Sequence, residues 1–111
     1  MVEIDKAFLK GLDKPLILWL LSREPMYGYD IIKEVKRLTG RRLKPNSIYP
    51  FLHLLEEKGF AVSEWINKRE RRIRYYSLTE KGENLLNRIR EFFQKPIREI
   101  LFNLLLDERT G

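Results

Sequence analysis

The chain has 111 residues, of which 43% are hydrophobic and 34% are charged. This balance supports the core of one domain and excludes global disorder, and the absence of cysteine excludes a disulfide framework and a thiolate metal site. Lys and Arg number 22 against 16 Asp and Glu, so the formal net charge of +6 favours a polyanionic partner.

The longest uninterrupted apolar run extends from Leu16 to Leu21. It is far shorter than the ~20 residues that a membrane-spanning helix requires. The first residues include the acids Glu3 and Asp5, and they lack the charged and then apolar segments of a signal peptide. We therefore expect a soluble protein of the cytoplasm.

An N-terminal segment is predicted over residues 1–12. Ile4, Phe8 and Leu12 recur at a spacing of four, which predicts an arm or a short amphipathic helix.

Two helices are expected next. Asp13 stands shortly before Pro15, so a buried helix should begin with Asp13 as its N-cap and end near residues 23–25. Residues 27–30 should begin a second helix, which Gly40 should end because glycine readily adopts the conformation of a helix C-terminus.

The third helix is predicted over residues 46–58, with Gly59 after its end. Its apolar residues recur with the 3.6-residue period of a helix that buries one face. They are Ile48, Phe51, Leu52 and Leu55.

A β-hairpin follows, because residues 60–67 and 72–78 are rich in β-branched and aromatic types and the polar segment 68–71 separates them. A terminal helix is then expected, with Thr79 as its N-cap. Pro96 lies within that helical pattern, which predicts a kink or a break near Gln94.

Three short helices, a hairpin and a long terminal helix describe a winged helix-turn-helix, of the mainly α (α+β) class. Residues 1–12 form the arm, residues 13–79 the winged domain, and residues 80–111 a C-terminal dimerisation helix. In this architecture the third helix enters the major groove of DNA, and the hairpin forms a wing along the backbone.

The outward face of the third helix is the first candidate site. Asn46 or Ser47 is placed to cap the helix or to donate a hydrogen bond to a phosphate, and Pro50 lies in or just past the first turn. Tyr49 and His53 share this face. The alternative is an ordinary cap followed by an exposed face that binds nothing.

Two groups of cations flank that face, and we expect them to contact phosphates. The alternative for the second group is a solvated charged turn. The first group is Arg41, Arg42 and Lys44, and the second is Lys68, Arg69, Arg71, Arg72 and Arg74.

No enzyme or cofactor chemistry is indicated. The chain has one histidine and no carboxylate at a convincing ligand spacing, which argues against a metal site. It also lacks a glycine-rich phosphate loop and a nucleophile elbow. The wing aromatics Trp65, Tyr75 and Tyr76 could stack on bases, but cross-strand packing is the favoured interpretation.

The stretches "MYGYDIIKEVKRLTG", "LKPNSIYPFLHLLEEKGF" and "RIRYYSLTEKG" resemble the PadR family of bacterial and archaeal transcriptional regulators. The resemblance implies a homodimeric winged-helix repressor, with Tyr27, Ser47, Tyr49 and Pro50 facing DNA. In some members a small aromatic or drug-like effector releases DNA. Residues 80–111 lack the tryptophan that sandwiches the ligand in some multidrug-binding relatives, which argues against that mode of binding.

The terminal helix supports a dimer on physical grounds, because its apolar residues would form a large exposed patch on a monomer. The predicted interface comprises Leu85, Ile89, Phe92, Phe93, Ile97, Ile100, Leu101, Leu104 and Leu105. We hypothesise a homodimeric repressor of double-stranded DNA with a palindromic operator. The alternative is a winged-helix module that binds another protein and no specific DNA.

Overall fold

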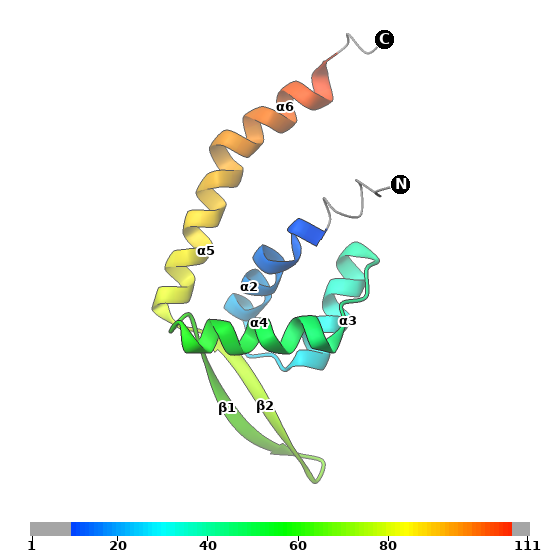
Figure 1. The fold of residues 1–111 in the computed structure, drawn as a ribbon, viewed down its shortest axis with the longest axis vertical. Coiled ribbons are helices and arrows are strands. Elements are labelled where there is room, and N and C mark those ends of the chain that lie inside the picture. The colour runs from blue at the N-terminus through cyan, green and yellow to red at the C-terminus, as the bar shows by residue number, and fades with distance from the viewer. Residues whose placement is uncertain (1–9, 108–111) are drawn as a thin grey trace.

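A computed structural model describes residues 10–107 and shows three helices, a hairpin and a long terminal helix (Figure 1). The elements are α2 (Asp13–Arg23), α3 (Gly28–Thr39), α4 (Pro45–Glu57), β1 (Ala61–Lys68), β2 (Arg71–Leu78), α5 (Glu80–Phe92), a π-helical turn (Phe93–Ile97) and α6 (Arg98–Leu106). The predicted fold class is confirmed. The predicted N-terminal arm lies mostly outside the described residues.

The core lies where α2, α3 and α4 meet the base of the hairpin. Ile31, Val35 and Leu52 are wholly buried there, and Tyr76 from β2 is almost so. Leu86 of α5 is also buried, so the terminal helix is attached to the body only through its first half. Beyond this core, the hairpin and the terminal helix project in opposite directions (Figure 1).

Two helix starts differ from the sequence prediction. Leu12, not Asp13, is the N-cap of α2, and Asp13 is the first helical residue. Lys44 is the N-cap of α4 and makes no side-chain capping bond, so neither Asn46 nor Ser47 is the cap. At α4 the reason is Pro45, because its fixed φ suits the first helical position and its ring holds the preceding residue, Lys44, extended.

The hairpin, here called the wing, pairs β1 and β2 antiparallel from Ala61 opposite Leu78 to Lys68 opposite Arg71. Its two-residue turn is Arg69 and Glu70, both with positive φ, which fits the right-handed twist of the strands. Met26 extends the sheet at the wing base, because its backbone N–H and C=O pair with those of Tyr76 at 2.9 and 2.8 Å.

Thr79 joins the end of α4 to the start of α5. Its hydroxyl accepts a hydrogen bond from the Gly82 N–H at 3.1 Å, which confirms the predicted N-cap, and donates one to the Gly59 carbonyl at 2.6 Å. Gly82 lies so close to Phe60 that an added Cβ would be 2.1 Å from its carbonyl oxygen. The junction therefore requires a residue without a side chain at position 82.

The terminal helix passes Pro96 without losing its helical backbone. The π-helical turn Phe93–Ile97 accommodates the proline, as wider helical turns often do where a regular hydrogen bond is missing. No residue from Phe93 to Leu106 is buried. Within residues 10–107, no helix is long and apolar enough to cross a membrane.

Gly82→Ala should lower the free energy of unfolding by roughly 1–3 kcal/mol, because the new methyl group must push away a backbone carbonyl. The urea denaturation midpoint measures this change. Gly11→Ala is the matched control, since nothing lies within 4 Å of an added Cβ there. Equal midpoints for the two variants would contradict the close approach at Gly82.

Candidate nucleic-acid interface

The outward face of α4 is built by the burial of its opposite side. Ile48, Leu52 and Leu55 are buried in the core. The residues that the helical period turns outward are exposed, and they include all the predicted candidates. These are Asn46, Ser47, Tyr49, Pro50 and His53.

Two prolines change the backbone hydrogen bonding at the start of α4. Pro45 has no N–H, and the N–H groups of Ser47 and Ile48 both donate to the Lys44 carbonyl, at 2.9 and 3.1 Å. Pro50 lies inside the helix and not near its cap, so the Asn46 carbonyl lacks its usual helical donor. The first turn therefore offers fewer backbone N–H groups to an anion than an ordinary helix start.

Tyr49 rests on the first residue of α3. A Cβ added to Gly28 would lie 2.6 Å from both Cζ and the hydroxyl oxygen of the Tyr49 ring. The ring is still 41% exposed. Gly28 therefore provides the space in which Tyr49 keeps its position on the outward face.

A tyrosine cluster adjoins this contact. The Tyr27 ring lies 6.0 Å from that of Tyr29 and 5.3 Å from that of Tyr75, between ring centroids. Burial raises the pKa of the Tyr27 hydroxyl above its usual range, and the negative charge of Asp30 adds to the effect. A tyrosine hydroxyl is protonated at neutral pH even without this shift, so it can donate a hydrogen bond there.

A groove of about 560 Å³ separates α4 from the wing and the start of α3. Its lining combines aromatic rings, among them Tyr49 and Trp65, with arginines of β2. The guanidinium groups of Arg72 and Arg74 lie 5.0 and 5.6 Å from the centroid of the Trp65 ring. This concave surface is therefore both cationic and aromatic.

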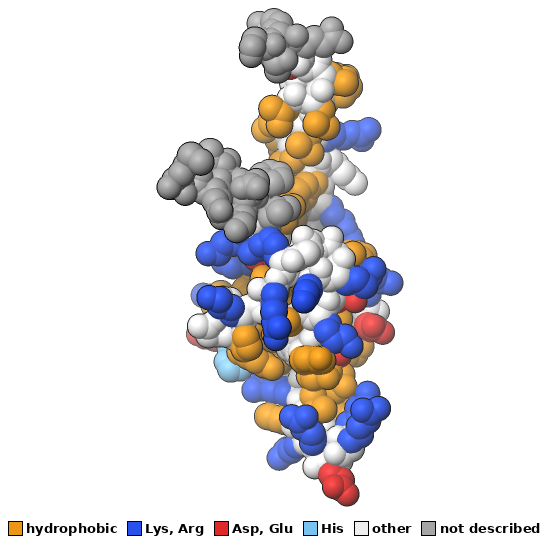
Figure 2. All heavy atoms as spheres, turned by 90° about the vertical axis from the view of Figure 1, so that its right-hand side faces the viewer, with side chains coloured by type: hydrophobic (Ala, Val, Ile, Leu, Met, Phe, Trp, Pro, Cys, Tyr) orange, Lys and Arg blue, Asp and Glu red, His pale blue; other side chains and the backbone are white. Residues whose placement is uncertain are grey.

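The wing carries a group of exposed cations near its turn. Figure 2 shows Lys and Arg side chains gathered at the lower end of the molecule, where the wing lies, with one acid at the tip. Lys68, Arg69, Arg71 and Arg72 are exposed, and none forms an ion pair in the described part of the chain. Arg42 and Lys44 are likewise exposed before α4.

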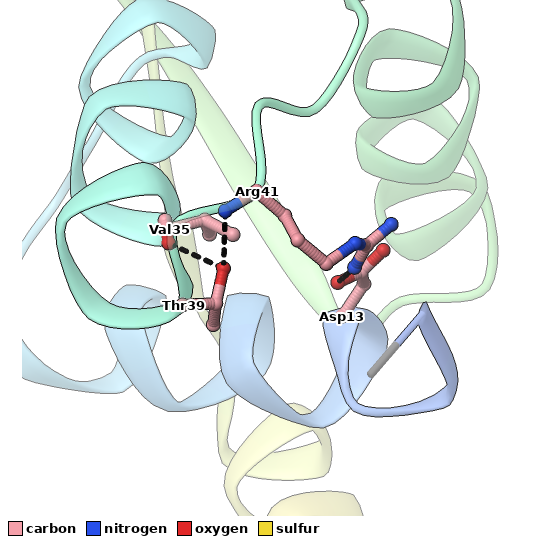
Figure 3. Close-up of polar contacts among 4 residues, drawn as sticks. All are labelled: Asp13, Val35, Thr39 and Arg41. Atoms are coloured by element: carbon pink, nitrogen blue, oxygen red, sulfur yellow. Dashed lines mark hydrogen bonds and ion pairs between the residues drawn. The ribbon is translucent and has the colours of Figure 1, made fainter. Parts of the chain in front are cut away.

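Two of the predicted phosphate ligands are instead paired with carboxylates. The Nη1 atom of Arg41 lies 2.5 Å from Oδ1 of Asp13, and the backbone N–H of Arg41 donates to the Thr39 hydroxyl at 3.1 Å (Figure 3). Arg74 lies 2.6 Å from Glu56. Arg41 thus links the segment before α4 to α2, and Arg74 links β2 to α4. No motif or spacing in the sequence pointed to either carboxylate partner.

No group of three or more His, Asp or Glu side chains among residues 10–107 could hold a metal ion. The chemistry of this surface is that of hydrogen bonding, aromatic contact and positive charge.

Comparison with known proteins gives the relationship. The family described as "Transcriptional regulator PadR-like family" matches residues 17–88. The transcriptional regulator Rv3488 of Mycobacterium tuberculosis is 35% identical over 87 residues, which are 77% of this chain and 78% of that protein. The transcriptional activator GvpE of Haloferax mediterranei is 30% identical over 66 residues, which are 60% of this chain. This chain spans only 34% of the length of GvpE.

The X-ray structure of a PadR-like transcription factor from Bacteroides fragilis has a TM-score of 0.72 and 28% identity, and the match covers 93% of this chain and 99% of that one. The family match runs from α2 through the wing into α5, so it includes every element of the interface described above. The chain therefore belongs to the PadR-like family of transcriptional regulators, not to a family of enzymes.

Proposed function

We propose that this chain regulates transcription by binding double-stranded DNA in a sequence-specific manner, with α4 in the major groove and the wing along the adjacent backbone. The observation that carries the proposal is the exposed polar face of α4, beside a wing turn whose cations form no ion pair among residues 10–107. A helix fits the width of the major groove, where side chains can read base edges. The exposed wing cations suit the phosphates on either side.

The terminal helix supports a homodimer. Leu104 and Leu105 lie on α6, where no side chain is buried by the body of the domain, and they are 70% and 76% exposed. Burial against a second copy removes this apolar surface from water and stabilises the helix. A two-fold dimer would present two copies of α4, spaced to suit half-sites one DNA turn or ~34 Å apart.

A dimer with two-fold symmetry should bind an operator whose two half-sites form a palindrome, and this binding should take place in the cytoplasm. Repression is the expected mode of action, because a bound dimer excludes polymerase from an overlapping promoter without any further contact. GvpE is named an activator, so relatives of this chain can act in the opposite sense.

The wing cations should account for much of the salt dependence of DNA binding. Replacing Lys68, Arg69 and Arg71 together by Gln should weaken binding and reduce the slope of log K against log salt by about 0.9 for each phosphate that the variant no longer neutralises. Mobility-shift titrations at several salt concentrations measure the slope. The control replaces Arg88, Lys95 and Arg98 by Gln, which changes the net charge equally but away from the interface.

Absence of binding to any duplex at low salt would overturn the proposed function. If both triple variants kept the wild-type slope, the wing would not contact phosphates. Retained binding of a protein partner by the wing variant, without DNA binding by the wild type, would favour the protein-docking alternative.

Tyr49 should contribute to DNA binding more than to folding. Tyr49→Ala should weaken specific binding by about 10-fold, a loss of ~1.4 kcal/mol, while the thermal transition is kept. Gly28→Ala should reproduce most of this loss, because its methyl group displaces the exposed Tyr49 ring. Filter-binding titrations and thermal denaturation provide the two measurements. A loss of folding in Tyr49→Ala would identify Tyr49 as a core residue.

The exposed stripe of α6 should control dimerisation. Leu104→Asp should raise the dimer dissociation constant by about 100-fold or more, because a symmetric interface loses the burial of two leucines at ~1.5–3 kcal/mol each. Sedimentation equilibrium measures this constant. Asn103→Asp adds the same charge next to the stripe and should leave the constant nearly unchanged. A monomeric wild type at micromolar concentration would refute the dimer.

A further inference from the structure

One side-chain network links the end of α4 to both strands of the wing. The carboxylate of Glu56 accepts a hydrogen bond from the Ser63 hydroxyl of β1 at 2.6 Å and another from the Arg74 guanidinium of β2 at 2.6 Å. The Nε–H group of Arg74 also donates to the Ser63 hydroxyl oxygen at 2.8 Å. The three residues therefore bond to one another in a closed ring.

The network lies where the wing leaves the core. Ala61 and Tyr76 are the buried residues of the two strands, and every residue of β1 after Ser63 is exposed. In Figure 1 the wing extends well beyond the helices from this point. The backbone bridge to Met26 holds the base of β2. The Glu56 network is therefore the outermost side-chain hydrogen bonding that joins the wing to α4 in the described part of the chain.

Arg74 is engaged on several sides. Its guanidinium lies 5.6 Å from the ring centroid of Trp65 and 5.4 Å from that of Tyr76, in addition to its bonds with Glu56 and Ser63. The side chains of Arg74 and Glu56 are only 34% and 30% exposed. A phosphate would have to replace a carboxylate that already takes two hydrogen bonds, so Arg74 is poorly placed as a phosphate ligand.

We infer that Glu56 and Arg74 are positioning residues that set the angle between the wing and α4. This inference rests on the proposed DNA binding, because its purpose is to hold the wing cations at the phosphates while α4 occupies the groove. It reverses the role expected for Arg74, which acts through Glu56 and not through the nucleic acid.

The sign of one substitution separates this role from a direct bond to phosphate. Glu56→Gln removes a negative charge near a polyanion, so simple electrostatics would strengthen DNA binding, the more so if it released Arg74 to a phosphate. Breaking the positioning ion pair should instead weaken binding about three- to five-fold, which is within the coupling measured for partly exposed ion pairs. Glu57→Gln is the matched control, one residue along the same helix, and should bind DNA equally or more tightly.

Further variants test whether Glu56, Ser63 and Arg74 act together. Arg74→Gln should weaken binding to the same extent without reducing the salt slope, whereas removal of a phosphate-neutralising cation reduces it. The double variant Glu56→Gln/Arg74→Gln should be no weaker than either single one, because both substitutions break the same ion pair. Ser63→Ala, which changes no charge, should also weaken binding.

A measurement without DNA tests the network independently. Amide hydrogen exchange in residues 64–74 should accelerate about three- to five-fold in Glu56→Gln and stay unchanged in Glu57→Gln, with exchange in α3 as the internal reference. Unchanged exchange in Glu56→Gln would overturn the positioning role, and so would tighter DNA binding by that variant. If the wild type bound no duplex, the proposed function would fail, and the exchange result would still decide whether Glu56 holds the wing.

Discussion

Burial of one apolar stripe on α4 is the constraint on which the rest of the interface depends. Ile48, Leu52 and Leu55 meet α3 and α2 in the core, and each buried side chain contributes ~1.5–3 kcal/mol to folding. Because successive helical residues are rotated by about 100°, fixing this stripe also fixes which residues face outward. The burial that folds the domain therefore also places Tyr49 and His53 on the outward face. Beyond this, Tyr49 is held by local contacts such as that with Gly28.

The cations of this chain divide into two groups by their partners. Arg41 and Arg74 join elements that are distant in the sequence, since they pair with Asp13 and Glu56 across separations of 28 and 18 residues. The cations near the wing turn form no ion pair within residues 10–107, and their side chains are exposed to solvent. Net charge alone does not separate the groups, and only the pairing shows which arginines support the fold.

Local patterns predicted much of this structure because local energies determine it. The 3.6-residue period located the outward face of α4, and Thr79 was identified as an N-cap from its position before a helical stripe. The proposed caps Asp13, Asn46 and Ser47 were wrong because several polar residues near a helix start compete for one position, and Pro45 decided it at α4.

Tertiary contacts were harder to foresee. The predicted hairpin already places Ser63, Trp65, Arg74 and Tyr76 on one face, since strand residues alternate between faces. Which face meets α4 depends on how the chain turns after Gly59, and no periodicity encodes that turn. The network of Glu56 therefore required the three-dimensional structure, although Glu56 could be recognised as a helix surface residue.

The turn of the wing has an energetic consequence. Arg69 and Glu70 both adopt left-handed backbone conformations, which cost an L-residue roughly 1–2 kcal/mol and which hairpins usually assign to Asn and Gly. The turn of the wing therefore has a less favourable backbone conformation than an Asn-Gly turn would have, but it carries two long charged side chains. Fraying should begin at this strained end, far from the core, so the wing can adjust to a curved surface while the packing of the helices stays intact.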